Sequence, residues 1–376
     1  MKVFEHGQSY KEIMPNIKRI LMYSVSFIFI YYAYYACAKR NEDFSKVVFL
    51  NKDQASIPAI KLHGQPVMEI DSFYEGHLSV IEPYLIIKSK KQVGTYHVFD
   101  FKNLFYLKSF GSIGQGPGEL QTSSTLIKST EFLRPNCVWV YDVNSRQVKL
   151  FSLLNLFYDR RENLVIETRQ IPDFAPPISN LFIDDSSFRG SLRDGNSRFF
   201  IYNFKNTRFQ TIPYPDSVDS EVSFSSKGLM YHSTMIEHKG KFVNALWSFN
   251  VLEIYDKNFC KLVKIVGKQK HNLMKNMFND EGHLNTSGNR YYIDLFVNDD
   301  FIFATQHNVK WNQLFQSDYS SKVLVFNWQG ELQYQFELDH PIYSLAYDGH
   351  NGRILASVPY GDRSYYEYNT GKLRIH

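Results

Sequence analysis

The sequence predicts an all-β chain folded as a six-bladed β-propeller, and three observations lead to this class. An apolar, aromatic segment ends in a small polar residue six times, and the intervals between these polar residues are 52, 51, 53, 71 and 42. This spacing is the length of one four-stranded blade with its loops. Aromatic residues make up 16% of the chain, which suits sheets stacked face to face. The six polar residues are Asp100, Ser152, Asn203, Asp256, Asn327 and Asn369.

The N-terminus carries the pattern of a secretory signal. Lys18 and Arg19 precede an uncharged, mostly apolar run of 17 residues, 20–36, which is short for crossing a bilayer core of about 30 Å. The run ends in Ala36 and Cys37, a pair that looks like the lipobox of bacterial lipoproteins, although Tyr34 stands where many lipoboxes have Leu. We expect residues 1–36 to be a signal segment and Cys37 to be lipidated.

Two alternatives for this segment are an uncleaved single-helix anchor and an ordinary cleaved signal. All three interpretations place the propeller outside the cytoplasm. The expected location is the cell envelope, with a lipid anchor on the periplasmic or the surface side of the outer membrane. Once Cys37 is modified, Cys137 and Cys260 remain; they fall on nonadjacent blades, and we expect both to be unpaired.

Residues 37–58 are mixed polar and are predicted to form a tether, with the propeller spanning residues 59–376. The segments 59–62 and 67–70 alternate apolar with polar side chains, as a strand with one wet face does. The last blade is short in its own sequence. We therefore expect a strand from residues 59–70 to complete it, which would close the ring and remove open sheet edges.

A glycine-rich segment, residues 111–120, lies between the first two blades. Its spacing matches neither phosphate-binding motif, and Pro117 removes one amide that such a loop would use. The expected role is structural: glycines provide positive φ angles in a tight connection, and Glu119 binds backbone amides. The residues of this motif are Gly111, Gly114, Gly116, Pro117, Gly118 and Glu119.

The same motif, read from Phe110 to Glu119, strongly resembles one found in TolB-like six-bladed propeller proteins of the Bacteroidetes lineage. The segment from Val325 to Gly330 is also similar to their pattern, and the resemblance covers roughly residues 60–374. Membership in that family implies the propeller fold and, for many members, a lipoprotein. It implies little about chemistry, because one fold hosts many functions.

Catalytic motifs are absent from the sequence. It contains no H-E-x-x-H, C-x-x-C or G-x-S-x-G pattern. Similar six-bladed lactonases bind calcium through acidic residues from separate blades, and Asp184-Asp185 and Asp299-Asp300 are the pairs that this chain would offer. Such pairs at strand ends more often cap turns. A metal-dependent lactonase or lyase with acidic ligands from several blades, with Ca²⁺ as its metal, is thus the alternative function.

Two segments are candidate binding sites. Arg189 and Arg193 stand on a Gly-containing segment and could hold a carboxylate through forked hydrogen bonds, although a solvated hairpin tip is the simpler interpretation. His307 and Trp311 lie in the extended fifth blade, where Trp311 could stack on a sugar ring or a partner's surface, although ordinary loop packing is the simpler interpretation.

The net charge of +4 falls to about +2 once residues 1–36 are set aside, and Lys and Arg are scattered. A nucleic-acid partner therefore has no electrostatic support. The function that we infer from the sequence is a monomeric, lipid-anchored propeller that binds a protein or glycan and catalyses no reaction. No cofactor is expected for this function.

Overall fold

The computed structural model describes residues 44–50, 57–70, 76–89, 96–116, 118–121, 124–127, 134–173, 175–193, 196–214, 228, 230–268, 289–310, 313–314, 319–359 and 363–374. The chain forms two units, residues 1–45 and 46–376, and nearly all described residues belong to the second. The predicted signal segment and Cys37 lie outside the described residues. In the described part, no helix is long and apolar enough to cross a bilayer.

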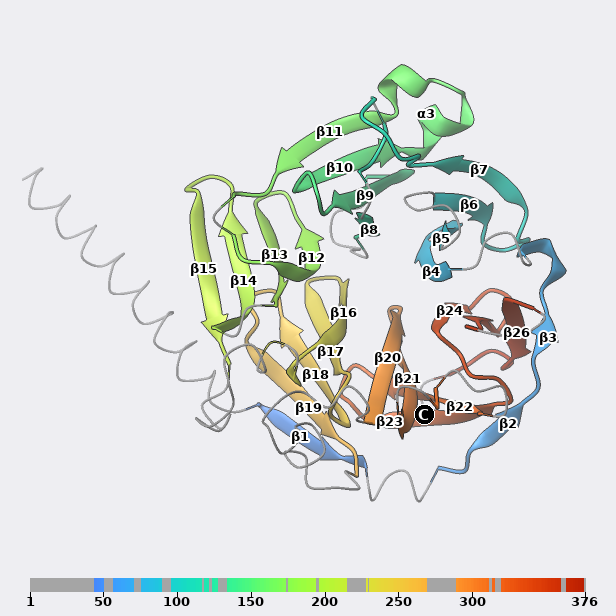
Figure 1. Cartoon of the computed structure of the whole chain (residues 1–376). Coiled ribbons are helices and arrows are strands. Elements are labelled where there is room, and N and C mark those ends of the chain that lie inside the picture. Colours follow the sequence, from blue (N-terminus) through green and yellow to red (C-terminus); the bar gives the residue numbers. More distant parts are fainter. Residues whose placement is uncertain are drawn as a thin grey trace, which may run out of the picture. The chain divides into compact units, whose positions relative to one another are not determined.

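The described strands between Lys46 and Asn369 form six sheets around a central axis, which confirms the six-bladed β-propeller (Figure 1). Each sheet has its first strand at the centre of the ring and its last at the rim. Blade one is β4 (Gly76–Ile81), β5 (Tyr84–Ser89), β6 (Tyr96–Asp100) and β7 (Tyr106–Phe110). Blade two is β8 (Ser124–Leu126), β9 (Cys137–Asp142), β10 (Gln147–Ser152) and β11 (Val165–Gln170). Blade three is β12 (Ile178–Ile183), β13 (Ser187–Leu192), β14 (Ser197–Asn203) and β15 (Arg208–Pro213).

The second half of the ring follows the same plan. Blade four is β16 (Ser233–His238), β17 (Lys241–Leu246), β18 (Val251–Asp256) and β19 (Lys261–Val266). Blade five is β20 (Asn289–Val297), β21 (Phe301–Lys310), β22 (Ser321–Asn327) and β23 (Leu332–Leu338). Blade six contributes β24 (Ser344–Asp348), β25 (Arg353–Ser357) and β26 (Tyr365–Asn369). The short helical elements are α3 (Leu153–Phe157), η1 (Met68–Ile70) and η2 (Arg161–Asn163).

The N-terminal strands run along the outside of blades four to six. β1 (Lys46–Phe49) pairs in parallel with β19, β2 (Ile60–Leu62) pairs in parallel with β23, and β3 (Gln65–Pro66) pairs antiparallel with β26. The expected closing strand is therefore present, but only β3 completes blade six. The part at residues 60–62 instead adds a fifth strand to blade five. β2 and β3 follow each other closely in the chain, and both lie at the rim of the ring. The extended segment 60–66 therefore passes along the rim from blade five to blade six.

The segment predicted as a tether, 37–58, contains β1, so the propeller unit begins at Lys46 and not at residue 59. Cys137 is buried and free, as expected. Cys260 is disulfide-bonded, so the expectation of an unpaired thiol was wrong for this residue. The position of Cys137 and Cys260 on nonadjacent blades excludes only a disulfide between these two residues.

The six polar residues of the repeat all end the third strand of a blade, and they cap the turn that follows it. Asp256 is typical: its Oδ1 accepts hydrogen bonds from the backbone N–H groups of Asn258 and Cys260, both at 2.8 Å. Asp100, Ser152, Asn203, Asn327 and Asn369 accept from a backbone N–H two or three residues downstream in the same way. A short polar side chain is required here because it satisfies turn amides that no strand partner reaches.

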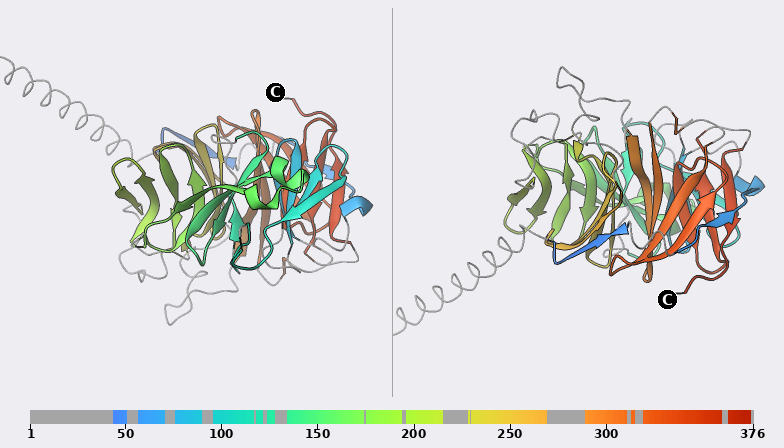
Figure 2. Two further views of the ribbon diagram at one scale, coloured as in Figure 1. Left: turned by 90° about the horizontal axis from the view of Figure 1, so that it is seen from above. Right: turned by 90° about the horizontal axis from the view of Figure 1, so that it is seen from below.

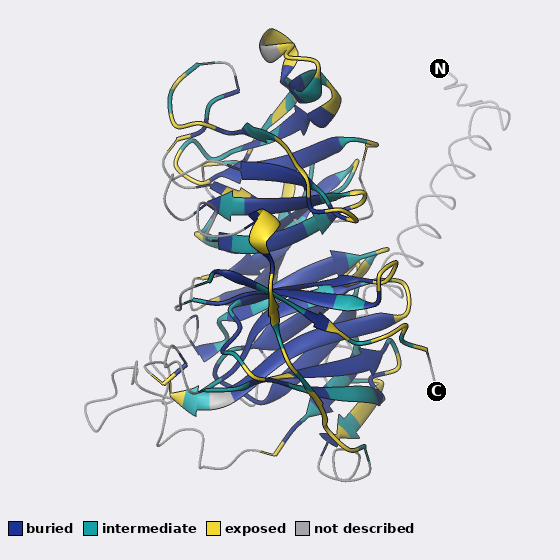
Figure 3. Cartoon of the chain, turned by 90° about the vertical axis from the view of Figure 1, so that its right-hand side faces the viewer, coloured by how far each residue is buried: buried dark blue, intermediate teal, exposed yellow. Residues whose placement is uncertain are grey.

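Apolar side chains fill the space between neighbouring blades. The strands are mostly buried, and exposure is concentrated in turns and in the N-terminal strands (Figure 3). Edge-on views show the blades side by side, with their strands running from one face of the ring toward the other (Figure 2). One buried cluster joins blades four and five through Leu252, Ile254 and Tyr292, and others join blades one and two, five and six, and six and one. The core is thus distributed around the ring.

The turn caps provide a direct test of the repeat. We expect Asp256→Ala to lower the free energy of unfolding by about 1–2 kcal/mol, because two backbone N–H groups lose a charged acceptor. Asp300→Ala is the control, since the exposed Asp300 carboxylate has no partner among the described residues, and its effect should stay within about 0.5 kcal/mol. Urea unfolding measures both variants. Equal stabilities of the two would contradict the capping role.

Candidate functional site

One end of the central channel carries a cluster of two arginines, a histidine and a tryptophan, which we call the mouth cluster: Arg193, His232, Trp247 and Arg290. His232 directly precedes β16, and Arg290 is the second residue of β20. Both therefore lie where innermost strands begin. Arg193 and Trp247 directly follow β13 and β17, second strands that end at the same side of the ring. The four residues come from blades three, four and five.

Backbone and side-chain contacts hold the aromatic part of the mouth cluster in place. The rings of His232 and Trp247 stack with centroids 4.3 Å apart and an interplanar angle of 22°. Trp247 N donates to His232 O at 3.0 Å, and Trp247 Nε1 donates to Thr234 Oγ1 at 2.9 Å. Thr234 in turn donates to Ile293 O at 2.6 Å. The stack is thus tied to the innermost strands of two blades.

The electrostatics of the mouth cluster are positive. Burial, together with the nearby charges of Arg193 and Arg290, lowers the pKa of His232 to about 4. His232 is therefore neutral at physiological pH, whereas both arginines are charged. No hydrogen bond to the His232 ring nitrogens is found among the described residues. Two cations beside a flat neutral surface form a suitable site for an anionic ligand with an apolar face.

Arg189 and Arg193, the first pair of sequence candidates, do not act together. Arg189 is the third residue of β13 and Arg193 directly follows this strand, so four extended residues, about 13 Å, separate their backbones. Arg189 Nη1 forms an ion pair with Asp184 Oδ2 at 2.5 Å, and only 13% of its side chain is exposed. Arg193 is exposed at the mouth. A strand separates side chains that look adjacent in the sequence.

The second pair of candidates also separates. His307 is 6% exposed inside blade five, its Nδ1 lies 3.4 Å from Ser321 Oγ, and its Nε2 is buried without a partner. Burial lowers the pKa of His307 to about 3, so the ring is neutral. His307 is thus an interior residue, and Trp311 lies outside the described residues.

The glycine-rich segment forms the connection from β7 to β8. Glu119 Oε2 accepts from Gly116 N at 2.7 Å, and Gly114 N donates to Leu120 O. A Cβ at Gly114 would lie 1.9 Å from the Glu119 carboxylate, so only glycine fits there. Lys149 Nζ and the Asp142 carboxylate bind the backbone on either side of Leu120. Gly111 and Gly118 have φ angles of 77° and 83°, and Pro117 lies outside the described residues.

The acidic pairs considered as metal ligands occupy turns. Asp184 caps the β12–β13 turn and pairs with Arg189, and Asp299 binds His238 and Lys239. Within the described ranges, no three His, Cys, Asp or Glu side chains are grouped so that they could hold a metal ion.

Comparisons with known proteins agree with this architecture. The model of the TolB-like six-bladed propeller family matches residues 76–350. The chain belongs to this family. No protein with a curated description matches the sequence.

Two solved structures share the fold of this family member. One is a DUF4221 family member from Bacteroides vulgatus, with 12% identity, a TM-score of 0.53, and coverage of 85% of this chain and 98% of that one. The other is a protein described as exported, from Bacteroides fragilis, with 10% identity, a TM-score of 0.52, and coverage of 88% and 99%. At these identities the likeness concerns the fold alone.

His232 reports on the charge of the mouth cluster. We expect its ring to titrate in the folded protein with a pKa of about 4, and Arg193→Ala to raise this pKa because one neighbouring positive charge is removed. Histidine-selective NMR measures both values. Because the folded pKa lies below that of the unfolded chain, His232 lowers stability progressively as the pH falls from about 6.5 to about 4.

Arg208→Ala is the matched control for this titration, since Arg208 is an exposed arginine on β15, the outer strand of the same blade. It should leave the His232 titration unchanged. A wild-type pKa near 6.5, or equal shifts in the two arginine variants, would contradict the proposed geometry.

Proposed function

We propose that this protein is a non-catalytic binding module of the cell envelope that recognises an anionic ligand, a carboxylate-bearing glycan, at the mouth cluster. The observation that supports this most is the joint position of Arg193, Arg290 and the His232–Trp247 stack at one end of the channel. A guanidinium forms paired hydrogen bonds with a carboxylate. An indole face supplies apolar contact to a sugar ring.

Three features favour binding over catalysis at this site. The single histidine is neutral and has a low pKa, which makes it a weak base. The cluster contains no carboxylate, and it contains no nucleophile paired with a base. The ring is rigid, since hydrogen bonds join the neighbouring blades three, four and five at their innermost strands.

Binding of digalacturonate, compared with a neutral digalactoside, tests the proposal. We expect calorimetry to show preferential binding of the charged disaccharide, and Arg193→Ala to weaken that binding about tenfold through loss of one charge-assisted contact. Binding should also weaken as salt is raised. Arg208→Ala is the matched control and should bind like the wild type. Equal affinity for both disaccharides, or unchanged affinity in Arg193→Ala, would contradict the proposal.

We also propose that a lipid on Cys37 anchors the module to the membrane, so that in the anchored protein the Cys37 sulfur is acylated and takes part in no disulfide. The support is the sequence itself: basic Lys18 and Arg19, the apolar run 20–36 and the small residue before Cys37. A monomer on such an anchor would present the mouth cluster to ligands in the envelope.

Membrane fractionation tests the anchor. Cys37→Ser should move the protein from the membrane to the soluble fraction, because the acylated sulfur is lost. Cys137→Ser is the control, since it changes a buried, free cysteine of blade two and leaves the lipobox and Cys260 as they are. Retention of Cys37→Ser in the membrane fraction, or equal release of both variants, would overturn the proposal.

A further inference from the structure

A cleft of about 470 Å³ lies between blades two and three, away from the mouth cluster. Its lining residues are Arg169, Gln170, Asp185, Phe188, Tyr202 and Phe204. Arg169 and Gln170 end β11, which runs along the rim toward blade three in Figure 1, and the other four belong to blade three. The volume falls in the range of small-molecule sites, about 300–1,000 Å³.

Arg169 is fixed on one side of the cleft by three contacts. Its Nε donates to Glu167 Oε1 at 2.6 Å, its Nη1 donates to Asp184 O at 3.2 Å, and its guanidinium lies 4.7 Å from the centroid of the Phe204 ring. In the described part of the chain, Nη2 has no hydrogen-bond partner. A donor held in this way loses little conformational entropy on binding a ligand.

Asp185, which directly follows the Asp184 carbonyl bound by Arg169, supplies an acceptor in the lining of the cleft. It is exposed, and its carboxylate has no hydrogen bond or ion pair with any described residue. The turn that carries it is rigid: Asp184 Oδ1 accepts from the backbone N–H groups of Ser186 and Ser187, both at 2.7 Å, and Arg189 binds Asp184 Oδ2. Arg189 thus has a positioning role for Asp185.

The partly exposed rings of Tyr202 and Phe204 form the apolar wall, and Phe188, which is only 1% exposed, packs behind them. Phe188 and Phe204 pack edge to face with centroids 4.8 Å apart, and Phe188 and Tyr202 stack at 6.3 Å. An aromatic wall beside a fixed donor and a fixed acceptor matches a sugar ring, which has one apolar face and a rim of hydroxyl groups.

The charges of the cleft exclude the ligand class of the mouth cluster. Arg134 and Arg169 both pair with Glu167, and Arg189 pairs with Asp184, so these three arginines and the carboxylates of Glu167, Asp184 and Asp185 carry no net charge together. Asp185 is the carboxylate among them that forms no ion pair with the described residues. A carboxylate ligand would face repulsion there, whereas a hydroxyl group can donate to Asp185. We infer that this cleft is a second binding site, for a neutral saccharide, with Asp185 as acceptor and Arg169 as donor.

The test is saturation-transfer NMR with cellobiose, maltose and diacetylchitobiose, each at about 10 mM, in the range expected for weak ligands. We expect at least one disaccharide to bind, and Asp185→Ala to weaken that binding about tenfold without changing the fold. Asp300→Ala is the matched control, since Asp300 is an exposed carboxylate in the corresponding turn of blade five.

The test of the cleft is independent of the test of the mouth cluster, because Arg193→Ala should leave the binding of neutral disaccharides unchanged. No binding of any of the three disaccharides, or equal binding by wild type and Asp185→Ala, would overturn the inference. Binding of the peptide Gly-Lys-Gly in place of the sugars would also overturn it, because the cleft would then be a cation site.

Discussion

The structure depends on the pairing of β3 with β26. A propeller is a ring of sheets, and each blade buries its apolar faces only against two neighbours, so the contacts of every blade require the ring to be closed. Blade six has three strands of its own, and Gln65 and Pro66 supply the fourth. Val67 N donates to Tyr365 O at 3.0 Å and continues this pairing. The chain reaches blade six past Gly64, where a Cβ would lie 2.9 Å from the Tyr368 ring.

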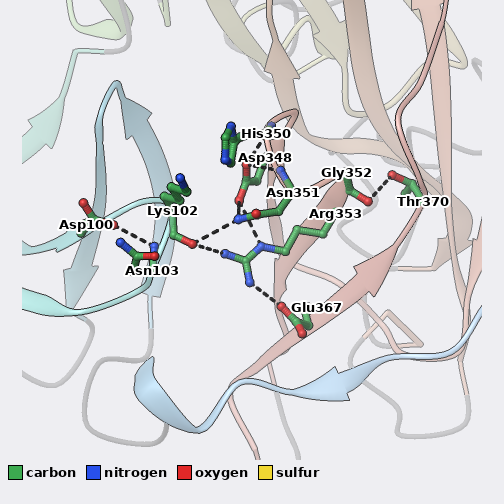
Figure 4. Close-up of polar contacts among 10 residues, drawn as sticks. All are labelled: Asp100, Lys102, Asn103, Asp348, His350, Asn351, Gly352, Arg353, Glu367 and Thr370. Carbon is green, nitrogen blue, oxygen red and sulfur yellow. Dashed lines mark hydrogen bonds and ion pairs between the residues drawn. The ribbon is translucent and has the colours of Figure 1, made fainter.

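Closure also needs blade six to meet blade one, and polar contacts at that junction are extensive (Figure 4). Arg353 donates to Lys102 O at 2.9 Å while it binds Asp348 and Glu367 of its own blade, and Asn351 donates to the same carbonyl. Near the axis, Leu78 N donates to Ser344 Oγ, which donates to Asp294 Oδ2. The innermost strands of blades one, six and five are thereby joined in one chain of hydrogen bonds.

The sequence was sufficient to predict the fold because the information is local. A polar residue such as Asp256 ends the third strand of each blade and caps the next turn, so the repeat is visible in the sequence. The path of residues 60–62 was not predictable, because alternation indicates a strand but does not name its partner. The mouth cluster was missed for a similar reason: Arg193, His232, Trp247 and Arg290 are far apart in sequence and share no motif. Their only signal is their position at the channel ends of strands. Arg189 and Arg193 look like neighbours, yet the strand between them separates their side chains.

Closure of the ring by β3 holds both proposed sites on one frame. Amide hydrogen exchange in β26 tests this closure most directly. A chain that begins at Phe44 is compared with one that begins at Met68 and therefore lacks the strands up to β3. The account predicts faster exchange across Tyr365–Asn369 and a lower unfolding temperature for the shorter chain, with protection restored by adding a peptide of residues 58–70. Equal exchange and equal stability in the two chains would contradict closure by β3.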